Sequence, residues 1–397
     1  MSAAPDRCPL CQEIGWPFVR REGVPVHQNQ LCATAEEARA VVVGDLRICH
    51  CTTCDFVWNA AFDPDRLSYH HAYDNRQTCS PRFTDHLESL IALLVDERGV
   101  RGSRIVEVGC GNGDFLRRLV LADPQNTGSG FDPSYRGPSE DLDGRLSFER
   151  SFFGPREATG TADAVVSRHV IEHVDEPLGL LELMRAAIAS APDPRLFLET
   201  PDVAWILERR VVWDFFYEHC SYFTPGSIEF AARLAGLEMV GVNLVFGGQY
   251  MWAQARPAPG GVERAVSRPA TTLGSAAEDF ERAESQLWER LGDQLAELLA
   301  RGPVAVWGAG AKGVTFANQL DPAGEMLACV ADLNPAKQGG FLPGTGHPIL
   351  SPGELDAQGI TSAILLNPNY EPEIREMLTG AQSSLNLVGA DQVGVTN

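Results

Sequence analysis

The feature that most constrains this chain is a strand, glycine turn and helix pattern between residues 104 and 116, which reads RIVEVGCGNGDFL. The apolar run from Ile105 to Val108 predicts a buried strand, and the apolar residues after the turn recur at helical spacing. Three glycines occupy the turn: Gly109, Gly111 and Gly113. Without a Cβ they let the backbone approach a bound cofactor closely.

Two carboxylates accompany this turn. Asp132 ends a second predicted strand about 20 residues on and is placed to accept ribose hydroxyls. Glu107 precedes the first glycine by two residues. The G-x-G-x-G spacing differs from the G-x-G-x-x-G loop that holds a dinucleotide pyrophosphate. A short loop with acidic groups favours S-adenosylmethionine (SAM), a cationic nucleoside without phosphates. A nicotinamide cofactor and a purely structural turn are the alternatives.

Composition excludes several classes of function. The chain has 397 residues and a net charge of −21, so two or three domains are expected and nucleic acid or an anionic membrane would be repelled. No apolar run approaches eighteen residues and no signal peptide opens the chain. We therefore expect a cytoplasmic protein with a small-molecule substrate, and the oligomeric state stays open.

The order of the patterns predicts three parts: 1–75, which holds paired cysteines; 76–255, which is α/β and holds the glycine turn; and 256–397, which is a second α/β part. In the middle part a helix at 84–95 and five strands at 105–108, 128–131, 164–166, 196–199 and 239–245 indicate a doubly wound α/β sheet. A Pro/Gly linker at 256–261 precedes a long helix at 276–300. The first part is rich in Cys, His and aromatic residues, with one helical pattern at 33–43.

Two C-x-x-C pairs lie in the first 75 residues. They supply four thiolates, enough for a closed tetrahedral Zn²⁺ site: Cys8, Cys11, Cys51 and Cys54. Because a closed site leaves no open position, we expect a structural zinc. Cys49 and His50 adjoin the second pair and are possible competitors. Cys32 and Cys79 are interpreted as ordinary thiols. The alternative for the four paired cysteines is that they bind no metal and are ordinary thiols too.

A histidine-rich segment follows the strand at 164–166. His169 and His173 stand four residues apart, so on a helix they would share a face. Ligands of open parallel sheets bind beyond the carboxyl ends of the strands, so this segment should border the cofactor or the acceptor. We expect His169 at the cofactor and His173 as a base or acceptor contact. The alternatives are a structural histidine and a metal site, for which the sequence offers no evident third ligand.

An aromatic segment near residue 220 holds the strongest catalytic candidates: Tyr217, Glu218, His219 and Tyr222. Its histidine offers a base tunable toward neutral pH, its glutamate a carboxylate to orient that base, and its tyrosines phenols to hold an oxyanion. The alternative is that these aromatic residues are only core.

With these residues in view, the whole chain resembles the SAM-dependent sugar C-methyltransferases, as a divergent member. The resemblance rests on the two cysteine pairs, Tyr73, the segment from Ser80 to His86, His173, the Glu218–Phe223 loop and the C-terminal stretch from Val304. It implies a zinc-binding domain, a class I SAM methyltransferase domain and a Rossmann-like substrate-binding domain.

The resemblance also implies a reaction. In that family a base removes the proton next to the 4-ketone of a nucleotide-linked deoxysugar, and the enolate carbon attacks the SAM methyl group. The Glu218–His219 pair would serve the acid/base chemistry. The chain departs from the family pattern in two places. Its glycine loop differs from the Ser-Asn-Asp variant that the sugar enzymes usually carry, and Phe216 and Tyr217 stand where those enzymes have tyrosine and histidine. O- or N-methylation of another small biosynthetic intermediate is therefore the alternative, and a non-catalytic zinc- and nucleotide-binding module is a third reading.

A second glycine loop lies in the C-terminal part. It reads GAGAKG from Gly308 to Gly313, with Asp332 about 20 residues on, and by itself is a dinucleotide fingerprint. An NAD-binding or bifunctional enzyme is one interpretation. The resemblance implies instead that this domain binds the nucleotide part of a substrate, with Lys312 at a helix N-terminus near a phosphate. A domain kept only for packing is the third possibility.

Overall fold

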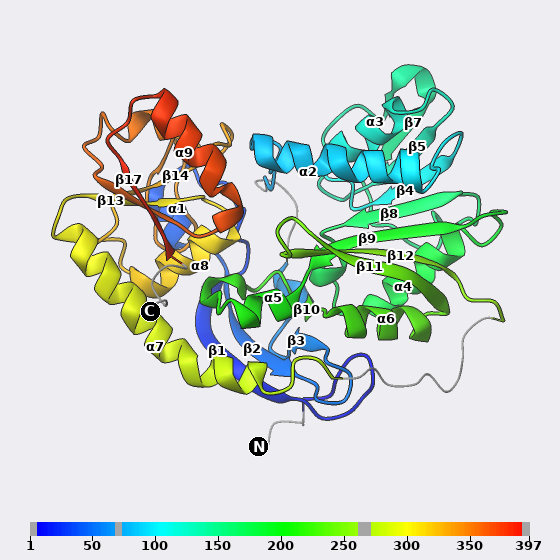
Figure 1. Cartoon of the computed structure of the whole chain (residues 1–397), viewed down its shortest axis with the longest axis horizontal. Helices are drawn as coiled ribbons and strands as arrows, with labels where there is room; N and C mark the ends of the chain where they lie inside the picture. Colours follow the sequence, from blue (N-terminus) through cyan, green and yellow to red (C-terminus); the bar gives the residue numbers. More distant parts are fainter. Residues whose placement is uncertain (1–5, 68–73, 261–270, 391–397) are drawn as a thin grey trace.

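A computed structural model describes residues 6–67, 74–260 and 271–390, and three β-sheets organise these ranges. Tyr73, which carries part of the family resemblance, lies outside the described residues. Figure 1 shows the largest sheet on one side, the C-terminal sheet on the other, and the N-terminal strands below and between them.

The N-terminal sheet has four antiparallel strands in the order β1-β2-β3-β10. They are β1 (Trp16–Pro25), β2 (Val43–His50), β3 (Val57–Asn59) and β10 (Ser221–Tyr222). The last strand comes from the middle of the chain, where Ser221 pairs with Trp58. The aromatic loop near residue 220 is thereby part of the N-terminal sheet.

The helix predicted at 33–43 is wrong in extent. Thr34 caps a short α1 (Ala35–Arg39), but the chain leaves the helix at Ala40. The N–H of Val26 then donates to the carbonyl of Val42 at 2.9 Å, and Val43 begins β2. The two β-branched residues join the sheet because pairing there outweighs a weak helical tendency.

The large sheet has eight strands in the order β11-β12-β9-β8-β4-β5-β7-β6. They are β4 (Arg104–Val108), β5 (Thr127–Phe131), β6 (Glu140–Asp141), β7 (Leu146–Glu149), β8 (Ala164–Arg168), β9 (Arg195–Pro201), β11 (Leu237–Val245) and β12 (Tyr250–Pro257). The central strands from β7 to β9 are parallel, and β12 enters antiparallel beside β9. This confirms the predicted doubly wound sheet, and all five predicted strands are present within two residues of their expected starts.

Helices cover both faces of this sheet. They are α2 (Pro81–Ala92), α3 (Asp114–Leu121), α4 (Pro177–Ala187) and α6 (Pro225–Leu234), whereas α5 (Val203–Glu208) packs in the apolar cluster of the N-terminal sheet. The helix predicted at 84–95 begins earlier because Ser80 caps it, accepting from the N–H of Phe83 at 3.1 Å. Its last turn widens into a π-helical segment, Leu93–Glu97.

The C-terminal sheet has five parallel strands in the order β15-β14-β13-β16-β17. They are β13 (Val304–Trp307), β14 (Cys329–Ala331), β15 (Ile349–Leu350), β16 (Ser362–Leu365) and β17 (Asn386–Gly389), with helices α8 (Ala311–Leu320) and α9 (Glu371–Gly380). An all-parallel sheet with crossover helices is Rossmann-like, as predicted.

The long helix α7 (Ala276–Leu299) runs from the N-terminal sheet to the C-terminal one (Figure 1). Its Phe280 ring lies 6.2 Å from Phe18 of β1 and 5.5 Å from Phe215. One buried apolar cluster therefore includes residues of all three predicted parts. The exact boundaries at 75 and 255 stay a prediction, since packing is continuous across them.

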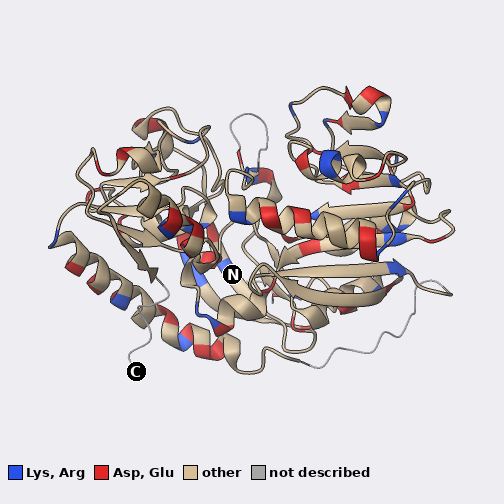
Figure 2. Ribbon diagram, turned by 45° about the horizontal axis from the view of Figure 1, so that its top comes forward, with Lys and Arg blue, Asp and Glu red and all other residues tan. Residues whose placement is uncertain are grey.

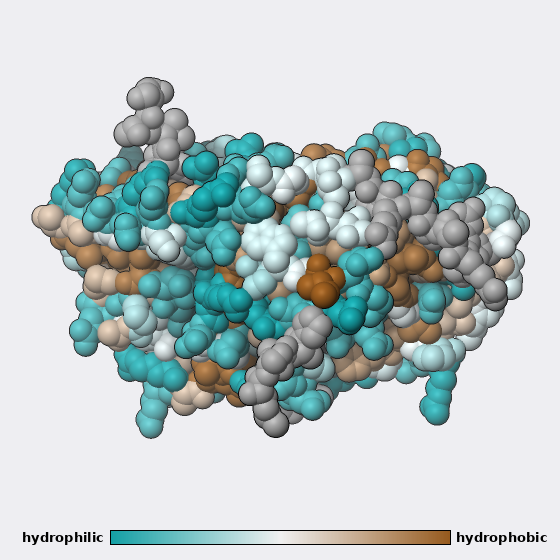
Figure 3. All heavy atoms as spheres, turned by 90° about the horizontal axis from the view of Figure 1, so that it is seen from below, coloured by the Kyte–Doolittle hydropathy of each residue, from teal (hydrophilic) through white to brown (hydrophobic). Residues whose placement is uncertain are grey.

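Charge and hydropathy are mixed over the surface. Figure 2 shows acidic side chains spread over all parts of the chain rather than gathered in one patch, and Figure 3 shows apolar side chains scattered among hydrophilic ones on the face seen from below. A search of the described helices finds none with the length and apolar character needed to cross a bilayer.

Candidate active site

Two cavities meet in the middle of the molecule. The sheet cavity, about 1040 Å³, lies beyond the carboxyl ends of β4, β5 and β8. The interface cavity, about 260 Å³, lies between the large sheet and the C-terminal domain. Residues lining both are Asn75, Arg76, Gln77, His169 and His173. A group bound in one cavity can therefore contact a group bound in the other.

The predicted glycine loop forms one wall of the sheet cavity. Gly109, Gly111 and Gly113 have φ angles of 73°, 55° and 79°, which side chains rarely adopt. A Cβ on Gly109 would lie 2.1 Å from a Val170 methyl, and one on Gly113 would lie 2.5 Å from the Phe148 ring. A Cβ on Gly111 would meet nothing within 4 Å. The middle glycine thus keeps the cavity wall bare, while the outer two permit close packing.

Glu107 is buried beneath this wall. Its side chain is at the sheet cavity, and its Oε2 has no hydrogen-bond partner among the described residues. Burial raises the pKa of this carboxyl to about 8, although the charge of Arg168 opposes the shift. A cation bound in the cavity would stabilise the ionised form of Glu107, which burial destabilises.

Asp132 closes the other side of the loop. Its Oδ2 accepts from the N–H of Gly111 at 2.8 Å, and its Oδ1 accepts from the N–H of Ser134 at 2.7 Å and the Ser134 hydroxyl at 2.6 Å. These bonds fix the carboxylate at the edge of the sheet cavity. Oδ2 accepts only one of these bonds and retains a lone pair, so the predicted contact with a ribose hydroxyl fits this geometry.

His169 and His173 border the junction of the two cavities, but not on one helix face. His169 has a φ of 53°, and only residues 171–173 form a helical turn. The shared helix face predicted from their spacing is therefore wrong. The Nδ1 of His169 lies 3.2 Å from Oε1 of Glu172, and its ring meets Tyr250 edge-on at 4.6 Å.

His219 stands opposite His173 in the interface cavity. Their ring centroids are 4.7 Å apart and nearly perpendicular, and the His219 ring also packs against Phe216 at 4.2 Å. Burial lowers the pKa of His219 well below 6.5, and the neighbouring basic side chains of His173, His169 and Lys312 lower it further. At neutral pH this imidazole is uncharged and can accept a proton.

Glu218 lines the same cavity but does not orient His219 as predicted. Its Oε1 lies 3.2 Å from Nδ1 of His27, and its Oε2 accepts from the N–H of Gln28 at 3.0 Å. Both partners follow β1. The carboxylate therefore anchors the loop that carries His219 to the N-terminal domain.

The two candidate tyrosines are not among the residues that line the two cavities. The Tyr217 hydroxyl accepts from the N–H of Asp63 at 2.9 Å and faces its carbonyl at 3.2 Å. The Tyr222 hydroxyl accepts from the N–H of Phe216 at 3.3 Å. Both rings are fully buried in the core. Their predicted catalytic role does not fit this placement, and they instead hold the loop in shape.

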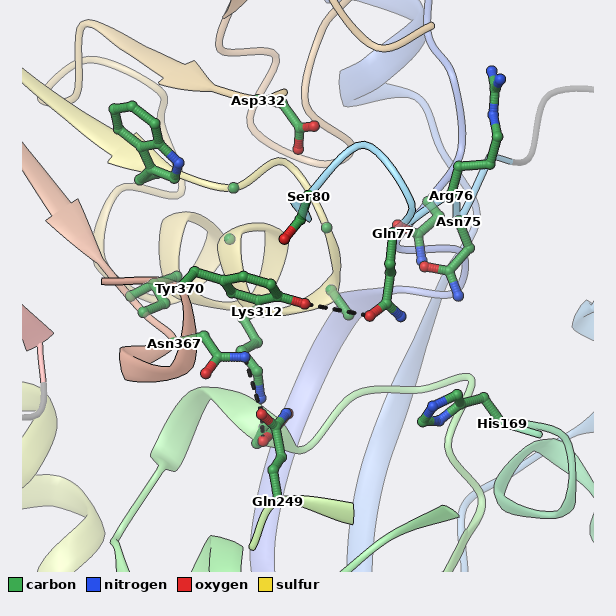
Figure 4. Close-up of a pocket in the computed structure, with 18 of the residues that line it drawn as sticks. Asn75, Arg76, Gln77, Ser80, His169, Gln249, Lys312, Asp332, Asn367 and Tyr370 are labelled. Atoms are coloured by element: carbon green, nitrogen blue, oxygen red, sulfur yellow. Dashed lines mark hydrogen bonds and ion pairs between the residues drawn. The ribbon is translucent and has the colours of Figure 1, made fainter. Parts of the chain in front are cut away.

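The second glycine loop lines the far end of the interface cavity (Figure 4). Asp332 accepts from the N–H of Ala309 at 2.7 Å through Oδ2 and from the N–H of Asn334 at 2.8 Å through Oδ1. Lys312 stands at the start of α8 and is paired with Asp214. Buried Lys337 donates to Asn29 and to the Ala309 carbonyl, each at 2.9 Å.

Several lining residues carried no sequence signal. Figure 4 shows Asn75, Gln77, Gln249, Asn367 and Tyr370 around the interface cavity. The Tyr370 hydroxyl lies 3.4 Å from Oε1 of Gln77, and the Asn367 amide donates to Gln249 at 3.0 Å. They come from three distant stretches of chain and belong to no local motif.

The four paired cysteines, Cys8, Cys11, Cys51 and Cys54, lie together as predicted. Their sulfurs lie within 4.8 Å of one another, with Cys8 to Cys54 at 3.5 Å and Cys11 to Cys51 at 3.4 Å. The two other possible zinc ligands, His50 and Cys49, contact different residues. His50 faces Asp55 at 3.0 Å, and the Cys49 sulfur faces Asp6.

Comparison with known proteins identifies the family. A methyltransferase domain family matches residues 81–242. A second family, described as the C-methyltransferase C-terminal domain, matches residues 270–384. Together these two matches show that the chain is a SAM-dependent C-methyltransferase. C-methyltransferase NovU of Streptomyces niveus is 28% identical over 93% of this chain and 91% of its own length. This C-methyltransferase therefore has the predicted fold class and uses SAM.

Solved structures resemble part of the chain. The 1,6-didemethyltoxoflavin-N1-methyltransferase of Burkholderia thailandensis, solved with S-adenosylhomocysteine, is 16% identical with a TM-score of 0.36, over 45% of this chain and 82% of that one. The dimethyltransferase RosA of Streptomyces davawensis is 22% identical with a TM-score of 0.36, over 44% and 54%. TM-scores of this size do not establish a shared overall fold.

Proposed function

We propose that this C-methyltransferase methylates a carbon next to the ketone of a nucleotide-linked keto-deoxysugar. The observation that carries the proposal is the interface cavity. One end holds His173 and His219 and opens to the sheet cavity, and the other holds the glycine loop with Asp332 and Lys312. Such a cavity suits a substrate with a reacting group at one end and a nucleotide at the other.

The sheet cavity would hold SAM. Bare Gly111 would let the cofactor approach, Asp132 would accept ribose hydroxyls, and Glu107 would face its positive charge. When bound, SAM supplies an electrophilic methyl group on a sulfonium centre. His169 lies where the two cavities join and would contact cofactor or acceptor.

His219 would act as the base. Its neutral imidazole would take the proton from the carbon next to the ketone, and that carbon would then form the bond to the methyl group as the methyl–sulfur bond breaks. His173 faces the resulting imidazolium and would help relay the proton to solvent. Phe216 packs on the His219 ring and would exclude water from it.

At the far end, the C-terminal domain would bind the nucleotide. Backbone N–H groups of a glycine loop at a helix N-terminus favour phosphate, and a carboxylate at the next strand end accepts ribose hydroxyls. Lys312 and Asp332 would take these parts. Packing alone would not require the loop to line a cavity.

We also propose that Cys8, Cys11, Cys51 and Cys54 hold a structural Zn²⁺. Four thiolates around a tetrahedral ion lie roughly 3.8 Å apart at ordinary Zn–S distances. The measured 3.4 and 3.5 Å separations are close to this spacing. Nothing in the cluster leaves an open position for substrate.

Isotope exchange tests the proposed reaction. With a thymidine-diphosphate 4-keto-deoxysugar in D₂O, wild-type protein should exchange the proton next to the ketone and, with SAM, methylate that carbon. His219→Asn should slow both steps by about 10²–10⁴-fold while SAM affinity by calorimetry stays unchanged. Tyr217→Phe serves as the matched loop control and should keep exchange.

Two outcomes would contradict the proposal. If nucleotide sugars do not bind while SAM does, the acceptor belongs to another class. If methylation occurs on oxygen or nitrogen without exchange at carbon, the replacement of the family's tyrosine by Phe216 has changed the reaction.

A further inference from the structure

Three potential metal ligands face one another in the interface cavity. One ligand atom each from Glu172, His173 and His219 lies within 4.8 Å of the other two. All three residues line the cavity, so a bound ion would keep an open coordination position toward it. Two imidazoles and one carboxylate are a donor set that suits divalent transition metals.

The Glu172 carboxylate is held in place by two hydrogen-bond partners. Its Oε1 faces Nδ1 of His169 at 3.2 Å, and its Oε2 accepts from the Thr200 hydroxyl at 3.0 Å. Metal-binding carboxylates are commonly fixed by such outer contacts. The Glu172 side chain is buried, so its orientation changes little without moving these partners.

The two imidazoles are short of partners. The Nδ1 of His173 is buried without a hydrogen-bond partner among the described residues. The His219 ring stands against the His173 ring, with 4.7 Å between their centroids. Ligand atoms around a tetrahedral ion lie roughly 3.3 Å apart, which small rotations of the rings would reach.

The charge of the cavity favours a cation. Its lining carries five carboxylates against three basic groups: Glu172, Asp214, Glu218, Asp332 and Glu373 against Arg76, Lys312 and Lys337. Lys312 is the basic group that opposes binding at His219, but it is paired with Asp214. Arg76 is likewise paired with Asp74 at 2.8 Å.

We propose that Glu172, His173 and His219 form a second metal site, which binds a divalent transition-metal ion and thereby inhibits methyl transfer. The ion would occupy the nitrogen of His219 that accepts the substrate proton. The inhibition rests on the proposed function, whereas the binding does not. The site is separate from the four-cysteine cluster and uses none of its ligands.

Metal stoichiometry tests the binding without any acceptor. Tag-free protein whose cysteine cluster is loaded with Zn²⁺ is titrated with Ni²⁺ and followed by native mass spectrometry and calorimetry. Wild type should take up one further equivalent. Glu172→Gln and His173→Asn should weaken its affinity at least tenfold, while His347→Asn, which removes a histidine that lines neither cavity, should not.

Inhibition is then measured with SAM and an accepted substrate. Ni²⁺ should inhibit wild type and inhibit Glu172→Gln at no less than tenfold higher concentration. Absence of a further equivalent, or equal affinity in the trio variants, would overturn the site. Acceleration by Ni²⁺ would overturn inhibition and make the ion a Lewis acid. If no acceptor turns over, the stoichiometry still decides the binding.

Discussion

Neighbouring residues of the loop from Phe216 to His219 face opposite environments. Tyr217 is buried against Asp63 in the N-terminal core, whereas Glu218 and His219 line the interface cavity. A residue's part in the reaction therefore depends on which way its side chain leaves the loop. The order of residue types does not specify that direction.

Tyr217→Phe should test this division at the residue scale. Removing the hydroxyl takes the acceptor from the partly buried Asp63 N–H, so the free energy of unfolding should fall by about 0.5–1.5 kcal/mol. Turnover of folded protein should change less than about twofold, because the phenol is outside the cavity lining. Urea unfolding and steady-state rates measure the two effects. A large loss of turnover with unchanged stability would place the phenol in the reaction.

Glu107 gives a prediction about protons. Its pKa of about 8 in the folded protein means that the carboxyl is mostly protonated at pH 7. A cationic SAM beside it should lower that pKa, so binding near pH 7 should release up to one proton. Calorimetry in buffers of different ionisation enthalpy should detect the release in wild type and not in Glu107→Gln.

The same shift has a consequence for stability. Because folding raises this pKa from 4.5 to about 8, the stability contributed by the protonated form is full below pH 4.5 and is lost as pH rises toward 8. Glu107→Gln should flatten that part of the stability curve. An unchanged pH slope would mean that the carboxyl is charged in the folded protein.

At the scale of elements, the cysteine cluster is tied to two distant segments. Asp55, directly after Cys54, accepts from the hydroxyl of Thr272 at 3.2 Å and the N–H of Leu273 at 3.2 Å, just before α7. Strand β3 pairs with β10, which follows His219. The cluster therefore supports the catalytic loop as well as its own domain.

Cys51→Ser should separate these roles. Losing one of four ligands should release Zn²⁺ and disorder the N-terminal sheet, so methyl transfer should fall at least tenfold. SAM affinity should change less than about threefold, because the sheet cavity contains no residue of the cluster. Metal content, circular dichroism and calorimetry follow these changes. Equal loss of SAM affinity would show that the N-terminal domain builds the cofactor site.

At the scale of the whole molecule, residues 74–80 connect the two cavities to the C-terminal domain. Asp74 accepts from Asn334 at 2.8 Å, and Ser80 donates to Glu373 at 2.8 Å. The same Glu373 accepts from the N–H of Arg82 at 2.8 Å in the first turn of α2. A ligand that orders the C-terminal side should therefore order the segment that lines the sheet cavity.

Glu373→Gln should weaken this connection. In wild type, thymidine diphosphate should raise SAM affinity about fivefold, the lower end of ordinary coupling free energies, and SAM should raise nucleotide affinity equally. In the variant, thymidine diphosphate should leave SAM affinity almost unchanged, and SAM should leave nucleotide affinity almost unchanged. Paired calorimetric titrations measure them, with Glu371→Gln on the same helix as control. Independent binding in wild type would contradict the coupling.

The sequence by itself determined the local parts. The Ile105–Val108 strand with its glycine loop, the cysteine pairs and the Gly308–Gly313 loop all follow from short-range patterns, because backbone conformation and metal-ligand spacing are set within a few residues. Tertiary structure alone decided the rest. It joined β10 to the N-terminal sheet, turned Tyr217 into the core, directed Glu218 to His27 and brought Gln77 to Tyr370. These contacts join residues more than 150 positions apart, and such pairing depends on how whole layers pack, which no local pattern encodes.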